Sequence, residues 1–272
     1  MSHTDKLIEI IKYLRTHNEG CPWTKEQTHK SLAPFFIEES YEAVEAIDNG
    51  NVGDELCSEM GDVLLQIALH AQIAEDDGRF DFDDVAKSIC EKLIRRYPTI
   101  LGDDKDTVLK TPAEVDKKWE EMKDEERRLK GIDPEKASIF DDVPHAIPAL
   151  IRSQKMAKRS VNAGIDWFTQ DHLLDKMDEK LHKMRAEINT DADKVNKENF
   201  SAEFGELLFV IAEIARIHDV DAEDSLRQAN NRIEKRVRYI EAKLKKDGKN
   251  FKQSLKDEVH HLWEEAKLQE KK

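Results

Sequence analysis

The chain repeats itself, and this repetition constrains its fold more than any other feature. Four blocks recur in the same order, three at an offset of 144 residues and one at 140. They are LRTHNEGCPW (14–23), EMGDVLLQIALHA (59–71), VAKSICEKLIRRY (85–97) and KWEEMK (118–123), with counterparts that begin at residues 158, 203, 225 and 262. This period is far longer than the unit of a solenoid, so the sequence predicts a tandem pair of domains.

A helix-breaking segment separates the two copies. Residues 126–148 contain three prolines and one glycine, which are residues that interrupt helices. We therefore predict an N-terminal domain over residues 1–130, a linker over 131–148 and a C-terminal domain over 149–272.

Both halves are predicted to be helical. Apolar residues recur at helical spacing, period-2 alternation is absent, and Gly (10) and Pro (7) are scarce. The predicted fold class is all-α.

The best-defined element is a helical hairpin. Its first helix is expected to open at Ser31 or at Ala33-Pro34 and to end at Asn49-Gly50, with the next helix following at once. The stripe expected to face the core of this first helix is Ile37, Tyr41, Val44 and Ile47.

Composition excludes several classes of protein. The net charge of −14 would repel a phosphate backbone, so polymeric nucleic acid is not an expected partner. The longest apolar run, 207–212, is too short to cross a bilayer and is stopped by Glu213, so we expect no membrane association and a cytoplasmic location. Three widely spaced cysteines argue against a disulfide framework and a cysteine zinc site.

Five acids occupy the two helices of the predicted hairpin. The spacing EExxE gives Glu38, Glu39 and Glu42, and ExxD gives Glu59 and Asp62 inside a largely apolar helix. Burying a carboxylate without a compensating charge is costly, and a divalent cation with oxygen ligands removes that cost. Gly61 is expected to let the two helices approach closely. Either motif alone is also typical of a solvated acidic face.

The combination of EExxE and ExxD resembles the MazG family of all-α nucleoside triphosphate pyrophosphohydrolases. GCPWTKEQTHKSLAPF, EDDGRFDF, KLIRRYP and KWEEMKDEER follow in the order of the MazG motifs, so the resemblance covers nearly the whole chain. It implies two MazG-like domains that form a four-helix bundle on homodimerisation. It also implies Mg²⁺-dependent (or Mn²⁺-dependent) hydrolysis of nucleoside triphosphates to monophosphate and pyrophosphate, as in house-cleaning of nucleotide pools.

The same resemblance assigns roles to individual residues. Those implied as metal ligands are Glu39, Glu42, Glu59 and Asp62. Glu38 would be a further ligand, or would orient or deprotonate the attacking water.

Basic and aromatic residues are implied as nucleotide contacts. They are Lys92, Arg95, Arg96, Trp119 and Lys123. From the residues alone, a solvated basic helix end and a tryptophan packed at a domain edge remain open.

The second copy departs from the acidic pattern. It keeps Glu203 and offers Glu206, but the best alignment sets DEKLHKM against IEESYEA. The residues at the EExxE positions are then Glu179, Lys180 and Lys183, whereas an ungapped register gives His182, Lys183 and Ala186. Ammonium groups cannot bind Mg²⁺ and could instead neutralise Glu203 and Glu206, so we predict a degenerate site.

Two other functions remain open. One is a narrower all-α pyrophosphohydrolase acting on dUTP or phosphoribosyl-ATP, and the other is a non-catalytic helical interaction or regulatory protein. The histidines, His29 and His70 among them, lack metal-ligand spacing and are expected to be surface or core residues.

Overall fold

The computed structural model describes residues 1–16, 18–101, 138–141, 143–165, 169–188 and 196–270, and positions 111, 114, 118, 122, 128 and 131. Within these ranges the regular secondary structure is helical and no strand forms, which confirms the all-α prediction. None of the helices described is both long and apolar enough to span a bilayer. The chain divides into two compact units, Met1–Gly131 and Ile132–Lys272.

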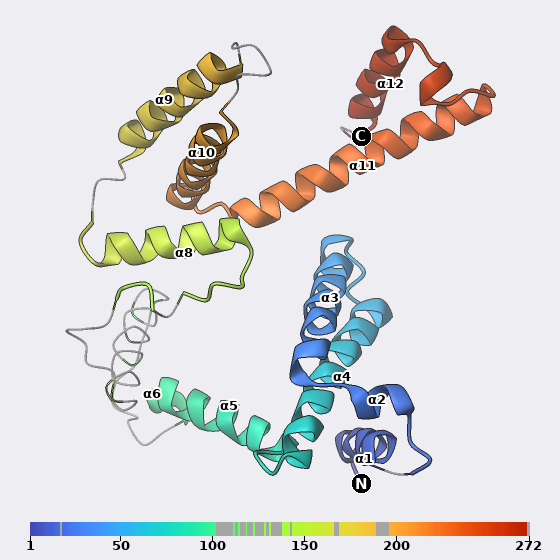
Figure 1. Cartoon of the computed structure of the whole chain (residues 1–272), viewed down its shortest axis with the longest axis vertical. Coiled ribbons are helices and arrows are strands. Elements are labelled where there is room, and N and C mark those ends of the chain that lie inside the picture. The colour runs from blue at the N-terminus through green and yellow to red at the C-terminus, as the bar shows by residue number, and fades with distance from the viewer. Residues whose placement is uncertain are drawn as a thin grey trace. The chain divides into compact units, whose positions relative to one another are not determined.

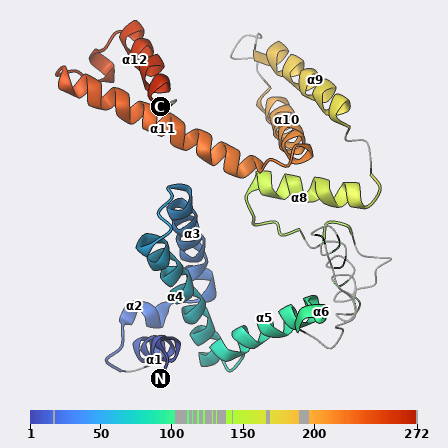
Figure 2. The ribbon, with the colours of Figure 1, turned by 180° about the vertical axis from the view of Figure 1, so that it is seen from behind.

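The first unit is built around a pair of long helices (Figure 1). α3 (His29–Asp48) and α4 (Asp54–Asp76) pack side by side, joined by a turn at residues 49–53. The same pairing is visible from behind (Figure 2). The other helices of this unit are α1 (His3–Thr16), α2 (Pro22–Glu26), α5 (Phe82–Arg96) and α6 (Pro98–Leu101).

Local hydrogen bonds fix where α3 begins and ends. The Thr28 hydroxyl accepts from the Ser31 amide at 3.2 Å, and the Ser31 hydroxyl accepts from the Thr28 amide at 2.9 Å. This reciprocal cap starts the helix at His29, ahead of both predicted starts, and Pro34 lies inside the helix. The predicted end is confirmed, because Gly50 adopts a φ of +74° directly after Asn49.

The predicted core stripe of α3 is wrong. Ile37, Tyr41 and Ile47 are 53%, 43% and 52% exposed, and Val44 is half-buried. The residues that α3 buries are Leu32, Ala43 and Ala46. Small alanines let α3 lie close to α4, and periodicity cannot show which of two faces does so. Glu39 falls on this inward stripe, seven residues after Leu32 and four before Ala43.

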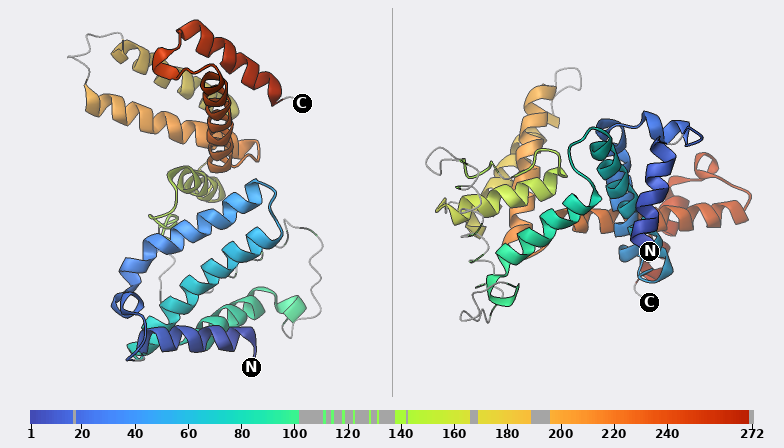
Figure 3. Two further views of the ribbon diagram at one scale, coloured as in Figure 1. Left: turned by 90° about the vertical axis from the view of Figure 1, so that its right-hand side faces the viewer. Right: turned by 90° about the horizontal axis from the view of Figure 1, so that it is seen from below.

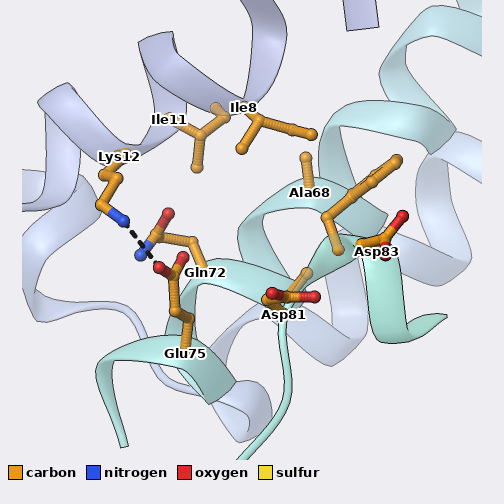
Figure 4. A pocket seen from close by; sticks show the side chains of 10 residues that line it. Ile8, Ile11, Lys12, Ala68, Gln72, Glu75, Asp81 and Asp83 are labelled. Carbon is orange, nitrogen blue, oxygen red and sulfur yellow. Dashed lines mark hydrogen bonds and ion pairs between the residues drawn. The ribbon is translucent and has the colours of Figure 1, made fainter. Parts of the chain in front are cut away.

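Ion pairs fasten α1 to the C-terminal end of α4. Lys12 Nζ lies 2.6 Å from Glu75 Oε1, and Arg15 Nε lies 3.0 Å from Asp76 Oδ2. Figure 4 shows the pocket of about 180 Å³ between these helices, with Lys12 reaching Glu75 beneath Ile11. None of the predicted site residues lines it, so this end of the hairpin is scaffold.

The second unit repeats the order of the first. Its helices are α8 (Ala149–Asn162), α9 (Gln170–Ile188), α10 (Lys197–Ile217), α11 (Ala222–Lys246), the 3₁₀ turn η2 (Phe251–Gln253) and α12 (Lys256–Gln269). α9 and α10 form a second helix pair, corresponding to α3 and α4 (Figure 3). α8 packs against α10 as α1 packs against α4. Each unit therefore contains a long helical hairpin, α3–α4 in the first and α9–α10 in the second.

Candidate metal centre

Carboxylates from both helices of the first hairpin converge. Glu39, Glu42 and Glu59 each offer one carboxylate oxygen, and these atoms lie within 4.8 Å of one another. Asp62 follows one turn after Glu59 and is close enough to raise the pKa of both Glu39 and Glu59. Glu38 is exposed and acts on Glu39 more weakly. The structure thus gathers four of the five predicted acids, with Glu38 beside them.

These acids repel one another. Partial burial raises the pKa of Glu39, and the charges of Asp62 and Glu42 raise it further. Partial burial likewise raises the pKa of Glu59, followed by the charges of Glu42, Asp62 and Glu39. Raised values mean that the ionised cluster is unfavourable as it stands.

No basic side chain of the described residues forms an ion pair with this cluster. The donor set is therefore an all-oxygen group of negative charge, which suits a hard divalent cation. Gly61 lies between Glu59 and Asp62, but a Cβ added there would meet no atom within 4 Å. The expectation that this glycine permits close helix approach is wrong, because the alanines of α3 supply the space.

The predicted phosphate-binding residues lie on a different helix. Lys92, Arg95 and Arg96 occupy the last turns of α5. α5 starts beside the C-terminal end of α4 and runs away from the hairpin (Figures 1 and 2), so one unit does not bring these cations to its own acids. Trp119 and Lys123 lie outside the described residues.

The second hairpin carries a cation where the first has an acid. Lys180 Nζ lies 2.8 Å from Glu203 Oε2 and also forms an ion pair with Glu206. Its side chain is only 9% exposed. Lys183 pairs with Glu179 at 2.8 Å and approaches Glu203 at 3.4 Å. Two lysines thus neutralise the acids that remain.

The pKa shifts of acids in the second hairpin have the opposite direction to those in the first. Hydrogen bonds from Lys176 and Lys183 lower the pKa of Glu179 to about 2. A hydrogen bond from Lys180 lowers the pKa of Glu203, and the hydrogen bonds of Lys180 to Glu203 and Glu206 raise its own pKa. Glu179 and Glu203 are thus more acidic than usual, whereas Glu39 and Glu59 of the first unit are less acidic.

The buried leucines identify the register of the second copy. Leu173 is 1% exposed and lies seven residues before Lys180, and Leu32 is fully buried and lies seven residues before Glu39. Lys180 therefore corresponds to Glu39, as in the gapped alignment, and Lys183 corresponds to Glu42.

Sequence reasoning missed a contact between two histidines. The Nδ1 atoms of His29 and His70 lie 2.8 Å apart, with the rings stacked at 5.1 Å, and Phe36 packs edge-on to His70. Burial lowers the pKa of His70, and the neighbouring His29 lowers it further. The pair joins the start of α3 to the middle of α4 and includes none of the clustered acids.

Comparison with known proteins agrees with the motif assignment. The family described as "MazG nucleotide pyrophosphohydrolase domain" matches residues 27–101. The chain is 36% identical over 270 residues to a nucleoside triphosphate pyrophosphohydrolase of Escherichia coli (strain K12), covering 99% of each chain. It is 35% identical over 263 residues to the nucleoside triphosphate pyrophosphohydrolase/pyrophosphatase MazG of Thermotoga maritima, covering 97% of this chain and 95% of that protein. Similarity to the uncharacterized protein YabN of Bacillus subtilis (strain 168) is 37% over 263 residues, covering 97% of this chain and 51% of YabN.

Proposed function

We propose, from the premise that this chain belongs to the MazG family of nucleoside triphosphate pyrophosphohydrolases, that its first unit is the catalytic one. It hydrolyses nucleoside triphosphates between the α- and β-phosphorus atoms, releasing a monophosphate and pyrophosphate. The observation that carries this assignment is the convergence of Glu39, Glu42 and Glu59 within 4.8 Å.

A divalent cation, Mg²⁺ or Mn²⁺, fits these residues. Glu39, Glu42, Glu59 and Asp62 would hold it, because oxygens of the first three are clustered and the raised pKa values of Glu39 and Glu59 call for positive charge. When bound, the cation neutralises triphosphate oxygens and so favours phosphoryl transfer.

A residue of the chain would orient the attacking water and accept its proton. Glu38 is exposed at the edge of the cluster, where its carboxylate can accept a hydrogen bond from the attacking water and then its proton. The alternative role of Glu38, as a further ligand, stays open.

Phosphate contacts from α5 would come from a second copy. Lys92, Arg95 and Arg96 lie in the last turns of α5, which runs away from its own hairpin (Figure 1), so a partner could bring them to the acids. Arg binds phosphate oxygens in bidentate fashion, which suits this role.

A homodimer also accounts for the apolar face of the hairpin. Ile37 and Tyr41 on α3 and Met60 and Leu64 on α4 are 53%, 43%, 56% and 36% exposed. A second copy packed on this face would complete a four-helix bundle, the architecture in which metal sites form between facing helices.

The second unit is proposed to be non-catalytic. Lys180 supplies the positive charge that Glu203 and Glu206 require, so a cation has no role there. This unit keeps the hairpin and contributes to folding and assembly.

The test compares matched acids in the two units. Glu59→Ala in the full chain should reduce Mg²⁺-dependent pyrophosphate release from nucleoside triphosphates at least about 100-fold, since it removes a ligand of the cation. Glu203→Ala, at the equivalent position, should leave the rate within about twofold. The assignment fails if the full chain releases no pyrophosphate with Mg²⁺, or if the two variants lose activity equally.

A further inference from the structure

We propose that Gln66, a residue to which no role has been assigned above, positions Glu39 for the cation. This inference rests on the proposed function of the first unit. Gln66 acts through Glu39 and is therefore a positioning residue.

Gln66 lies on the same face of α4 as the clustered acids. It follows Asp62 by four residues and Glu59 by seven, so the three side chains form one stripe toward α3. Gln66 is 5% exposed, and its side-chain amide is close enough to Glu39 to lower the pKa of that carboxyl. An amide held in a packed environment fixes the rotamer of the carboxylate that it contacts.

The oxygen of the same amide lacks a hydrogen-bond partner in the part of the chain that the structure describes. Gln66 Oε1 is buried and accepts no hydrogen bond from the described residues. A buried acceptor left unsatisfied costs desolvation free energy, and such a group calls for an explanation. A hydrated divalent cation carries O–H donors, so loading the site would satisfy this acceptor.

The second unit supplies an internal comparison. The residue equivalent to Gln66 is Val210, which is 8% exposed. There Lys180 occupies the position of Glu39 and is held by Glu203 and Glu206 directly. The buried amide is thus present where four acids lack a counter-ion and absent where a lysine provides one.

A matched control lies on the same helix. Gln72 is 4% exposed and donates to Asp76 Oδ1 at 2.9 Å, at the end of α4 that packs on α1. Methionine has nearly the volume of glutamine and no strong hydrogen-bonding group, so Gln→Met preserves packing at both positions.

The experiment measures the response of the full chain to Mg²⁺ in two ways. The first is the rise in Tm on adding Mg²⁺ without nucleotide, and the second is the Mg²⁺ concentration for half-maximal pyrophosphate release. In Gln66→Met we expect a smaller Mg²⁺-induced rise in Tm and about a tenfold higher activating concentration. Its Tm in EDTA should be unchanged or higher, because an unsatisfied acceptor has been removed. Gln72→Met should respond to Mg²⁺ as the unsubstituted chain does.

Three results would count against the inference. The inference fails if Gln66→Met keeps the Mg²⁺ response of the unsubstituted chain, and a lower Tm for it in EDTA would make Gln66 a packing residue only. An equal loss of Mg²⁺ response in Gln72→Met would point to a general effect on α4. If the unsubstituted chain itself shows neither Mg²⁺ response, the proposed function fails first, which separates the two outcomes.

Discussion

Glu39 in the first unit and Lys180 in the second occupy equivalent inward positions of their hairpins, yet they carry opposite charges. Glu39 adds to the repulsion around it, and the pKa values of Glu39 and Glu59 are raised. Lys180 cancels the charge of its neighbours, and the pKa of Glu203 is lowered. The same helical hairpin thus holds either an acid cluster that needs a cation or one whose charge is already balanced by lysines.

The difference shows how to separate a functional acid cluster from a structural one. Acids that stabilise a fold are paired and have lowered pKa values, as Glu179 and Glu203 do. Acids that lower stability until a ligand arrives have raised values, as Glu39 and Glu59 do. A motif comparison separates the two units by residue identity alone, whereas the directions of the pKa shifts explain physically why one cluster needs a cation and the other does not.

The largest expected effect comes from converting the second unit into a copy of the first. Lys180→Glu with Lys183→Glu, in a Glu59→Ala background that disables the first site, leaves the second hairpin with five acids, of which Glu179 keeps its ion pair with Lys176. In EDTA the Tm should fall by about 5 °C, because ion pairs become repulsions. Millimolar Mg²⁺ should restore much of this loss, and calorimetry should detect a Mg²⁺ site absent from the Glu59→Ala parent.

A control for this conversion changes the same net charge elsewhere. Lys245→Glu with Lys246→Glu alters two exposed residues at the end of α11. If Mg²⁺ stabilises this control as strongly as the conversion, the effect is one of general charge and the equivalence of Glu39 and Lys180 is refuted.

Sequence patterns predicted the features that depend on the spacing of residues along the chain. The duplication, the helical hairpin and the turn after Asn49 required only periodicity and turn chemistry, and the family resemblance located the acids. Which face of α3 is buried could not be predicted, because both Ile37–Ile47 and Leu32–Ala46 follow helical periods. The choice depends on the close approach that Ala43 and Ala46 permit, which is a tertiary effect.

Contacts between helices were also missed, although a signal existed. In an antiparallel hairpin, residues equally far from the turn face each other. Glu42 and Glu59 follow this rule closely about the turn at residues 49–53, whereas His29 and His70 lie 20 and 17 residues from it and follow the rule only to within one helical turn. The course of α5 had no such signal, so the distance between Lys92 and the acids could not be predicted from sequence.

A smaller effect should distinguish the apolar faces of the two hairpins. Leu64 and Leu208 are equivalent and are 36% and 38% exposed. Placing a carboxylate on a packed interface costs about 2 kcal/mol, so Leu64→Glu and Leu208→Glu should each weaken self-association in sedimentation experiments. Only Leu64→Glu should also reduce pyrophosphate release, because its face adjoins the acid cluster. Leu255→Glu, at a 76% exposed residue outside both hairpins, is the control, and equal behaviour of all three variants would contradict a dimer through these faces.

The smallest expected effect is a pair of opposite pH dependences, measured in EDTA. Because the pKa of Glu39 is raised by folding, the folded state keeps this proton longer than the unfolded chain, and stability falls as pH rises above about 4.3. Glu39→Gln should therefore raise the Tm at pH 7 and change it little at pH 4.

The second pH dependence is that of Glu179. Because folding lowers the pKa of Glu179 to about 2, its contribution to stability is present above about pH 4.3 and is lost as pH falls toward 2. Glu179→Gln should then lower the Tm at pH 7 by about 1–2 °C, since surface ion pairs contribute little, and should have no effect near pH 2. Calorimetric scans from pH 2 to 7 would show both trends. If the Tm of both variants shifted in the same direction with pH, the proposed difference in charge balance between the two hairpins would be wrong.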